Sequence, residues 1–190
     1  MHEESGARSL FKQQRLELSV QQMEKLNDLM LIQFQSCDLP FVDHLFSYWP
    51  IEENNEPATH LFTEFLRFRN PGMQVLYPKS DFTKNAMHAV VTDIDTPFTK
   101  HEYNIYEPES DQVVDPKTID LVFVPLIICD HRGYRVGYGK GFYDRYLTQC
   151  RADCIKIGFS FFEPIPVLED ANEFDVPLDL CITPQNVYVF

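Results

Sequence analysis

The segment at residues 135–144, Arg-Val-Gly-Tyr-Gly-Lys-Gly-Phe-Tyr-Asp, constrains the fold more than any other part of this chain. Three glycines alternate there around Lys140, and glycine reaches backbone angles that let main-chain N–H groups approach an anion closely. Apolar residues at helical spacing follow, so the segment predicts a loop that leads into an amphipathic helix. With positive charge on Arg135 and Lys140, such a loop is typical of a phosphate-binding site.

A nearly continuous apolar run, Asp-Leu-Val-Phe-Val at residues 120–124, lies upstream of this loop. It predicts a strand buried on both faces of a parallel sheet, and Pro125 ends its regular pairing. Strand, loop and helix in this order place the phosphate site at the carboxyl end of an α/β sheet. The glycine spacing matches neither a P-loop nor a dinucleotide fingerprint, so spacing alone supports a glycine-rich turn before an ordinary helix equally well.

Helical and strand patterns alternate along the rest of the chain. They predict an α/β fold, a three-layer α/β/α architecture with a mostly parallel, Rossmann-like sheet, in a single domain over residues 1–190. Ser19 is expected to cap a second helix, with Gln22 completing a capping box. Residues 79–117 are polar and predict irregular structure with a short strand near 89–91. Helices are expected over residues 8–35, 57–68 and 141–150, and strands over 41–48, 74–77, 120–124, 154–159 and 180–183.

Composition excludes several classes of protein. The net charge is −13, with 16 Lys and Arg against 29 Asp and Glu, so no broad basic surface for nucleic acid can form. No apolar run approaches membrane-spanning length, and the first residues lack the pattern of a signal peptide. The five cysteines lack metal-ligand spacing and are expected to be free thiols. We therefore expect a cytoplasmic protein that binds neither nucleic acid nor membrane. We also expect a monomer.

Residues 120–125, Asp130, Gly133 and residues 135–147 together resemble the signature segment of the 5-formyltetrahydrofolate cyclo-ligase family, also called 5,10-methenyltetrahydrofolate synthetases. Weaker similarities extend over most of the chain, among them Arg8 and Arg15 ahead of Leu18-Ser19, Glu56 with Thr59, and residues 176–183. The resemblance implies an enzyme that uses ATP and Mg²⁺ to close the reduced folate 5-formyltetrahydrofolate to 5,10-methenyltetrahydrofolate, releasing ADP and phosphate. Such phosphoryl transfer needs positioning and charge neutralisation, which a cationic glycine loop supplies.

The resemblance also implies which residues form the site. Lys140 and Arg135 are expected to be catalytic. ATP is expected to contact Arg8, Arg135, Val136, Gly137, Tyr138, Gly139, Lys140, Gly141, Phe142 and Tyr143. The folate is expected to contact Ile51, Glu56, Tyr138, Gly139, Lys140, Gly141 and Phe142. Magnesium is expected at Asp144 and Asp179, because this hard cation takes one or two carboxylates together with substrate phosphates.

Each carboxylate has a plainer interpretation if the resemblance is set aside. Asp144 would be a solvated helix residue that pairs with Lys140, and Asp179 a turn residue before the last strand. Glu56 would be an acidic residue in the first turn of a helix, where the helix dipole favours it.

One departure from the family pattern concerns ATP. Four residues before Arg8, where the family usually has a lysine that contributes to ATP binding, this chain has Glu4, whose carboxylate would repel a triphosphate. Lys12 lies one turn beyond Arg8 and is a candidate substitute. The departure keeps open a diverged, non-catalytic folate- or nucleotide-binding protein. A sugar-phosphate enzyme on a similar scaffold is a further alternative.

Overall fold

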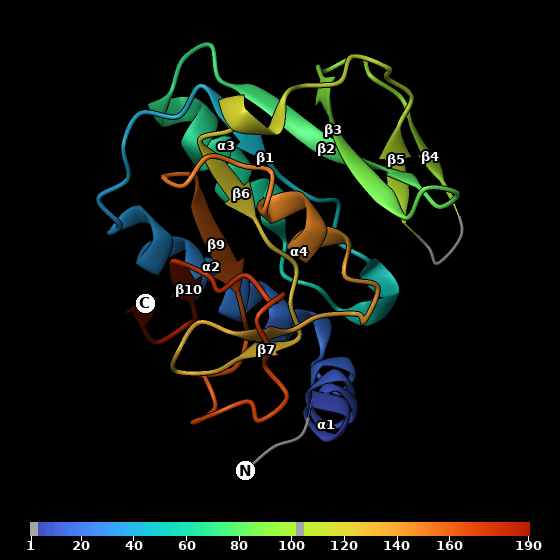
Figure 1. The fold of residues 1–190 in the computed structure, drawn as a ribbon. Coiled ribbons are helices and arrows are strands. Elements are labelled where there is room, and N and C mark those ends of the chain that lie inside the picture. Colours follow the sequence, from blue (N-terminus) through green and yellow to red (C-terminus); the bar gives the residue numbers. More distant parts are fainter. Residues whose placement is uncertain (1–3, 102–104) are drawn as a thin grey trace.

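A computed structural model describes residues 4–101 and 105–190 of the chain (Figure 1). The helices are α1 (Glu4–Leu16), α2 (Val20–Gln35), α3 (Thr59–Arg69) and α4 (Phe142–Leu147), with 3₁₀ turns η1 (Glu52–Asn54) and η3 (Pro116–Thr118). The strands are β1 (His44–Phe46), β2 (Gln74–Asp81), β3 (Ala86–Thr92), β4 (Phe98–Lys100), β5 (Tyr106–Pro108), β6 (Leu121–Phe123), β7 (Ile128–Cys129), β8 (Arg135–Val136), β9 (Ile155–Phe159), β10 (Leu180–Ile182) and β11 (Val187–Val189).

Within the described residues, the main sheet has seven strands in the order β11-β10-β9-β6-β1-β2-β3. The five central strands, β10 to β2, pair in parallel, whereas β11 and β3 add antiparallel edges. Two-stranded ribbons, β4–β5 and β7–β8, stand apart from this sheet. The predicted mostly parallel α/β sheet is therefore confirmed.

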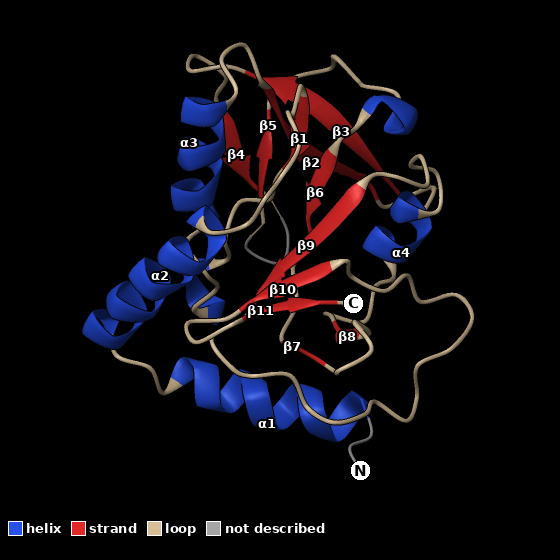
Figure 2. Cartoon of the chain, turned by 90° about the vertical axis from the view of Figure 1, so that its left-hand side faces the viewer, coloured by secondary structure: helices blue, strands red, loops and turns tan. Residues whose placement is uncertain are grey.

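Helices cover both faces of the sheet, as Figure 2 shows with α2 and α3 on one side and α4 on the other. Successive strand residues point to opposite faces, which sorts the core into two layers. Leu45 and Phe123 pack against Phe34 of α2 in one layer. Phe46 packs against Tyr146 of α4 in the other layer, with ring centroids 4.9 Å apart. The predicted α/β/α layering follows from this alternation.

The segments that follow the neighbouring parallel strands β1 and β6 cross to opposite faces of the sheet. After β1 the chain passes through α3 on one face and returns as β2. After β6 it passes through α4 on the other face and returns as β9. A crevice opens between the carboxyl ends of two strands that diverge in this way, and α/β folds bind ligands there.

The N-terminal helices join as the sequence predicts. Ser19 caps α2: its hydroxyl accepts the N–H of Gln22 at 3.3 Å, and the Gln22 side chain accepts the Ser19 N–H at 2.9 Å. The predicted capping box is confirmed. Helix α1 then lies across the end of the molecule beside β7 and β8 (Figure 2), where Ala7 packs against Ile128 and Val136.

Residues 79–117 differ most from the sequence-based expectation. Here β2 continues to Asp81 and pairs with β3 in a long hairpin, and β4 pairs with β5. Beyond Leu76, β2 no longer pairs with β1 but with β3 alone, so Pro78, which lacks an N–H, is tolerated there. Residues 102–104 of this segment lie outside the described residues.

Other elements also differ from expectation. The sequence predicts that residues 137–141, the glycine loop, follow a single strand. The ribbon β7–β8 instead separates β6 from this loop. These strands are too short to show periodicity, as is β11. The helix expected over residues 141–150 ends at Leu147.

The cysteines and the helices were the subject of two further expectations. The cysteines, which all lie within the described residues, are free, as expected. Among the helices of residues 4–101 and 105–190, none is long and apolar enough to cross a bilayer. The first three residues, part of the segment that lacks a signal-peptide pattern, lie outside the described residues.

Phe34 is the side chain on which we expect the core to depend most. It is fully buried, and its ring contacts those of Phe62, Phe123 and Phe159 with centroids 5.5–5.9 Å apart. Phe34→Ala should lower the free energy of unfolding by about 3–5 kcal/mol in denaturant titration. Phe68→Ala, at an 85% exposed position on α3, is the matched control and should change it by less than about 0.5 kcal/mol. Equal losses in the two variants would contradict this account of the core.

Candidate active site

A cavity of about 840 Å³ opens at the carboxyl ends of β1 and β6. Tyr48 and Trp49, which follow β1, and Pro125, which follows β6, form its floor. The hairpin β2–β3, helix α1 and the glycine loop contribute the walls. The expectation that the site lies at the carboxyl end of the sheet agrees with this position.

The glycine loop has backbone conformations that require glycine. Gly139 and Gly141 have φ angles of +79° and +64°, in the left-handed region that other residues rarely adopt. A Cβ on Gly139 would also lie 3.4 Å from Nη1 of Arg8. Arg8 itself holds the loop from α1, because its Nε donates to the carbonyl of Gly137 at 2.9 Å. The loop is therefore set in place by its own glycines and by α1.

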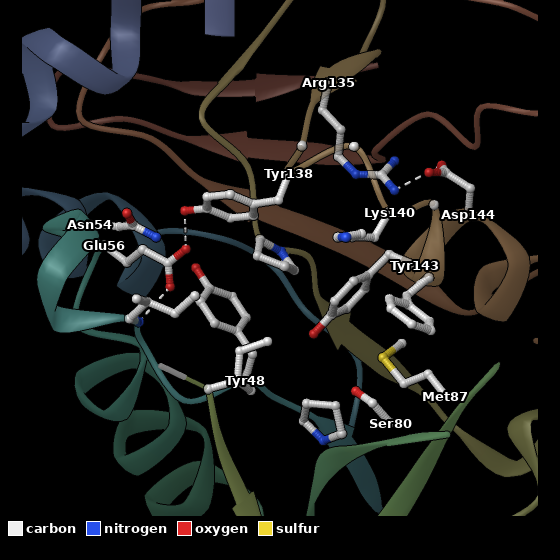
Figure 3. A pocket seen from close by; sticks show the side chains of 18 of the residues that line it. Tyr48, Asn54, Glu56, Ser80, Met87, Arg135, Tyr138, Lys140, Tyr143 and Asp144 are labelled. Atoms are coloured by element: carbon white, nitrogen blue, oxygen red, sulfur yellow. Dashed lines mark hydrogen bonds and ion pairs between the residues drawn. The ribbon is translucent and has the colours of Figure 1, made fainter. Parts of the chain in front are cut away.

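Lys140 and Arg135 both line the cavity, but the structure gives them different surroundings (Figure 3). The Arg135 side chain is only 5% exposed and points to Asp144, donating from Nη2 to Oδ1 at 2.8 Å. Its Nη1 donates to the carbonyl of Val176 at 2.5 Å. Arg135 therefore holds Asp144 in place, a contact that the sequence did not predict. Asp144 thus forms an ion pair with Arg135.

The two carboxylates expected to bind magnesium are not brought to the cavity together. Asp144 lines it, whereas Asp179 is absent from the described lining residues. Oδ2 of Asp179 instead accepts from the backbone N–H of Lys156 and from its ammonium, each at 2.7 Å. Sequence order alone could not show that these contacts turn Asp179 toward β9.

Asp175 is a lining carboxylate that was not predicted from the sequence. The N–H of the next residue, Val176, donates to Oδ1 of Asp144 at 3.1 Å, so the chain carries Asp175 beside Asp144. No group of three or more His, Cys, Asp or Glu residues in the described chain could hold a metal ion by itself. Two carboxylates nevertheless suit magnesium when phosphate oxygens and water complete its coordination. Asp144 and Asp175 could therefore share such an ion.

Glu56 lies at the opposite end of the cavity from Lys140 (Figure 3). It is 9% exposed; Oε1 accepts from the Tyr138 hydroxyl and Oε2 from the N–H of Ile51 at 2.7 Å. Burial raises the pKa of the Glu56 carboxyl, while the hydrogen bonds from Tyr138 and Ile51 oppose the shift. Glu56 precedes α3 and points into the cavity, so the alternative of an ordinary first-turn residue does not describe it.

Aromatic rings separate the two ends of the cavity. Figure 3 shows Tyr48 and Tyr138 next to Glu56 and Tyr143 next to Lys140. Among the described residues, the buried Tyr143 hydroxyl has no hydrogen-bond partner, and burial raises the pKa of this phenol. Such walls suit a flat heterocycle, which would stack on the rings. The sequence places Tyr48 at the end of an expected strand, where a large aromatic is more often a core residue than a ligand contact.

Most of the residues implied by the family resemblance meet at this cavity. Arg8, Ile51, Glu56, Arg135, Gly137, Tyr138, Gly139, Lys140, Gly141, Phe142, Tyr143 and Asp144 line it. Val136 is not among the described lining residues: on β8 it points away from Arg135 and is buried against α1. Ser80 and Met87 line the cavity from the β2–β3 hairpin and were not expected, since that segment reads as irregular.

Glu4 also lines the cavity, and its carboxylate forms an ion pair with Arg8. The acidic residue that departs from the family pattern is therefore close to the glycine loop. Arg8 divides its guanidinium between Glu4 and the carbonyl of Gly137.

Comparison with known proteins identifies the family. The sequence model of the 5-formyltetrahydrofolate cyclo-ligase family matches residues 44–184. This chain belongs to that family. The expectation of a cyclo-ligase enzyme, drawn from the signature segment, is confirmed at this level.

Individual relatives agree. A 5-formyltetrahydrofolate cyclo-ligase from Mycoplasma pneumoniae is 33% identical over 144 residues, which cover 75% of this chain and 74% of the relative. The protein of the same name from Haemophilus influenzae is 31% identical over 121 residues, 60% of this chain and 61% of the relative.

Solved structures agree over nearly the whole chain. The 5,10-methenyltetrahydrofolate synthetase of Mycoplasma pneumoniae has a TM-score of 0.74 at 26% identity, covering 96% of this chain and 99% of its own. The Aquifex aeolicus synthetase has a TM-score of 0.77 at 27% identity, covering 98% and 92%. The similarity of fold therefore includes α1 and α2, which precede the segment matched by the family model.

The backbone of the glycine loop yields a direct test. Gly139→Ala should lower the free energy of unfolding by about 1–2 kcal/mol, because alanine is strained at a φ of +79°. Gly137→Ala is the matched control: its Cβ would meet no atom within 4 Å and its φ is outside the left-handed region. We expect this control to stay within about 0.5 kcal/mol of the parent protein. Thermal or denaturant unfolding measures both, and the reverse order would refute the loop conformation.

Proposed function

We propose that this protein uses ATP and Mg²⁺ to cyclise 5-formyltetrahydrofolate to 5,10-methenyltetrahydrofolate, with release of ADP and phosphate. The observation that carries the proposal is a single cavity with a buried carboxylate, Glu56, at one end and the glycine loop with Lys140 at the other. Aromatic walls lie between them. Membership of the cyclo-ligase family supports a reduced folate as the substrate.

The reaction explains why both ends are needed. A formyl group on nitrogen is amide-like and a poor electrophile, so its oxygen is first phosphorylated by the γ-phosphate of ATP. The second folate nitrogen then attacks the activated carbon and loses its proton, and the former formyl oxygen leaves with phosphate. Phosphoryl transfer of this kind depends on alignment and on neutralising charge that develops at the phosphate.

At the nucleotide end, the Lys140 ammonium and the amides of the glycine loop would neutralise the transferred phosphoryl group. Arg135 would keep Asp144 oriented through its hydrogen bond to Oδ1. Magnesium, held by Asp144 and Asp175, would supply further charge neutralisation to the phosphates.

At the folate end, the fixed carboxylate of Glu56 would accept hydrogen bonds from N–H groups of the pterin ring. Tyr48 and Tyr143 would stack on or border the ring. The cavity would therefore hold the formyl group between the pterin contacts and the phosphate of ATP. This arrangement converts an encounter of two substrates into an aligned reaction.

The deciding experiment follows absorbance of the methenyl product after protein, 5-formyltetrahydrofolate, Mg²⁺ and ATP are mixed. Product that requires both ATP and Mg²⁺ is the expected result. Folate binding without product would instead favour a non-catalytic binding protein, the alternative that Glu4 keeps open. Turnover of a sugar phosphate without ATP would favour the other alternative, a sugar-phosphate enzyme on a similar scaffold.

Other expectations from the sequence stay predictions. They are a cytoplasmic location, a monomeric state and a single domain over residues 1–190.

Lys140→Ala tests the nucleotide end. Removing the ammonium should lower kcat by about 100-fold or more, because a charge that stabilises the transferred phosphate is lost. Initial rates at saturating folate and ATP measure this effect. Lys25→Ala, at an exposed position on α2, is the matched control and should leave the rate unchanged. Equal rates for Lys140→Ala and the parent protein would remove Lys140 from the phosphate site.

Glu4→Lys tests the departure from the family pattern. The exchange removes a carboxylate from the cavity and its pairing with Arg8, so the KM for ATP should fall by roughly fivefold. Glu17→Lys makes the same charge change at an exposed position beyond the end of α1 and should not alter this KM. An unchanged KM in the Glu4 variant would mean that the triphosphate does not approach α1.

A further inference from the structure

Arg15, in the last turn of α1, is a buried cation outside the cavity. It is 2% exposed, and none of the described residues offers it a carboxylate within ion-pair distance. Nη1 donates to the carbonyl of Leu126 at 3.0 Å and Nη2 donates to the Tyr138 hydroxyl at 2.7 Å. A buried charge without a direct counter-charge is costly unless a nearby opposite charge stabilises it.

The hydrogen-bond chemistry of these groups fixes the direction of a chain of contacts. A guanidinium can only donate, so the oxygen of Tyr138 must accept from Arg15. The single phenolic proton of Tyr138 is then left for Oε1 of Glu56. Because the N–H of Ile51 donates to Oε2, both carboxylate oxygens are held by donors. Arg15 thereby orients Glu56 through one intervening side chain.

The hydrogen bonds from Arg15 to Tyr138 and from Tyr138 to Glu56 also stabilise the negative charge of the Glu56 carboxylate. Among the described residues, the charged and titratable groups that face Glu56 are Arg15 and Lys12 from α1, Tyr138 from the glycine loop, Tyr48 after β1 and Tyr143 from α4. Of these groups, only Arg15 and Lys12 are cations. Burial raises the pKa of Glu56, whereas the Tyr138 hydrogen bond and the charges of Arg15 and Lys12 lower it. Arg15 and Glu56 thus form a buried pair of opposite charges joined by Tyr138.

We infer that Arg15 is a positioning residue which, through Tyr138, keeps Glu56 ionised and oriented to accept the N–H groups of the folate. The inference rests on the proposed function. It gives helix α1 a role in folate binding through Arg15. A protonated Glu56 would present an O–H to those N–H donors and lose an acceptor. Loss of Arg15 should therefore weaken folate binding rather than the chemical step.

The experiment measures folate binding as a function of pH in Arg15→Gln. Trp49 lines the cavity and is the only tryptophan of the chain, so its fluorescence reports binding of 5-formyltetrahydrofolate without turnover. The parent protein should bind folate above the pKa of Glu56 and lose affinity as the pH falls through it. In Arg15→Gln this loss should move to higher pH. At neutral pH the Kd for folate should rise by about tenfold, with the KM for ATP little changed.

Two further variants separate positioning from folding. Tyr138→Phe deletes only the hydroxyl that joins Arg15 to Glu56, and should also move the loss of binding to higher pH. Arg15→Lys keeps the charge but lacks the second donor arm, so its Kd should rise with a smaller displacement of the pH profile. Arg67→Gln removes an exposed arginine from α3 and should match the parent protein in both respects.

The outcomes are distinct. If Arg15→Gln and Tyr138→Phe raise the Kd without displacing the pH profile, Arg15 is merely structural and the inference is overturned. Displaced binding profiles in a protein that forms no ATP-dependent product would support the inference and refute the proposed reaction. A parent protein that does not bind 5-formyltetrahydrofolate at any pH would refute both.

Discussion

The parallel pairing of β1 with β6 is the interaction on which the rest of this structure depends. It sets Leu45 opposite Leu121 and Phe46 opposite Val122, so each strand contributes to both core layers. Because the chain leaves these two strands toward opposite faces, their carboxyl ends cannot both be covered by the helices that follow. The cavity is therefore a consequence of topology, and the segments after β1 and β6 bring Tyr48 and Pro125 to its floor.

Groups of opposite charge lie at the two ends of this cavity, and helix α1 contacts the residues at both ends. The chain carries a net charge of −13, yet it places Lys140 at one end of the cavity and a buried carboxylate at the other. Helix α1 supports both ends, with Arg8 bound to the carbonyl of Gly137 and Arg15 bound to the hydroxyl of Tyr138. These arginines are two helical turns apart and so reach the same loop from one face of the helix. A cavity with a cation at one end and a carboxylate at the other is thus held in place within a protein of net negative charge.

Local signals were sufficient for part of the site. The glycines of the loop and the capping box at Ser19 act over a few residues, and both have the expected conformations. Long-range partners were not predictable in the same way. The sequence shows Arg135 as a cation beside a phosphate loop, but its contact with Val176 depends on where the segment after residue 170 returns. The same segment brings the Val176 N–H to Asp144, the ion-pair partner of Arg135. The same reason applies to Asp175 and Asp179. Asp175 lies where the returning segment passes the cavity, whereas Asp179 is absent from the described lining residues.

The sequence by itself determined the α/β class, the buried strand at β6, the glycine loop and the family to which the chain belongs. These properties follow from periodicity, from backbone preference and from an ordered motif, all of which are encoded within short stretches. Only the tertiary structure decided that β2 and β3 extend to wall the cavity, that Arg135 serves Asp144, and that Arg15 faces Glu56 across Tyr138. The contact between Arg15 and Tyr138 spans 123 positions and that between Tyr138 and Glu56 spans 82. A one-dimensional pattern contains no term for the distance between such residues in space.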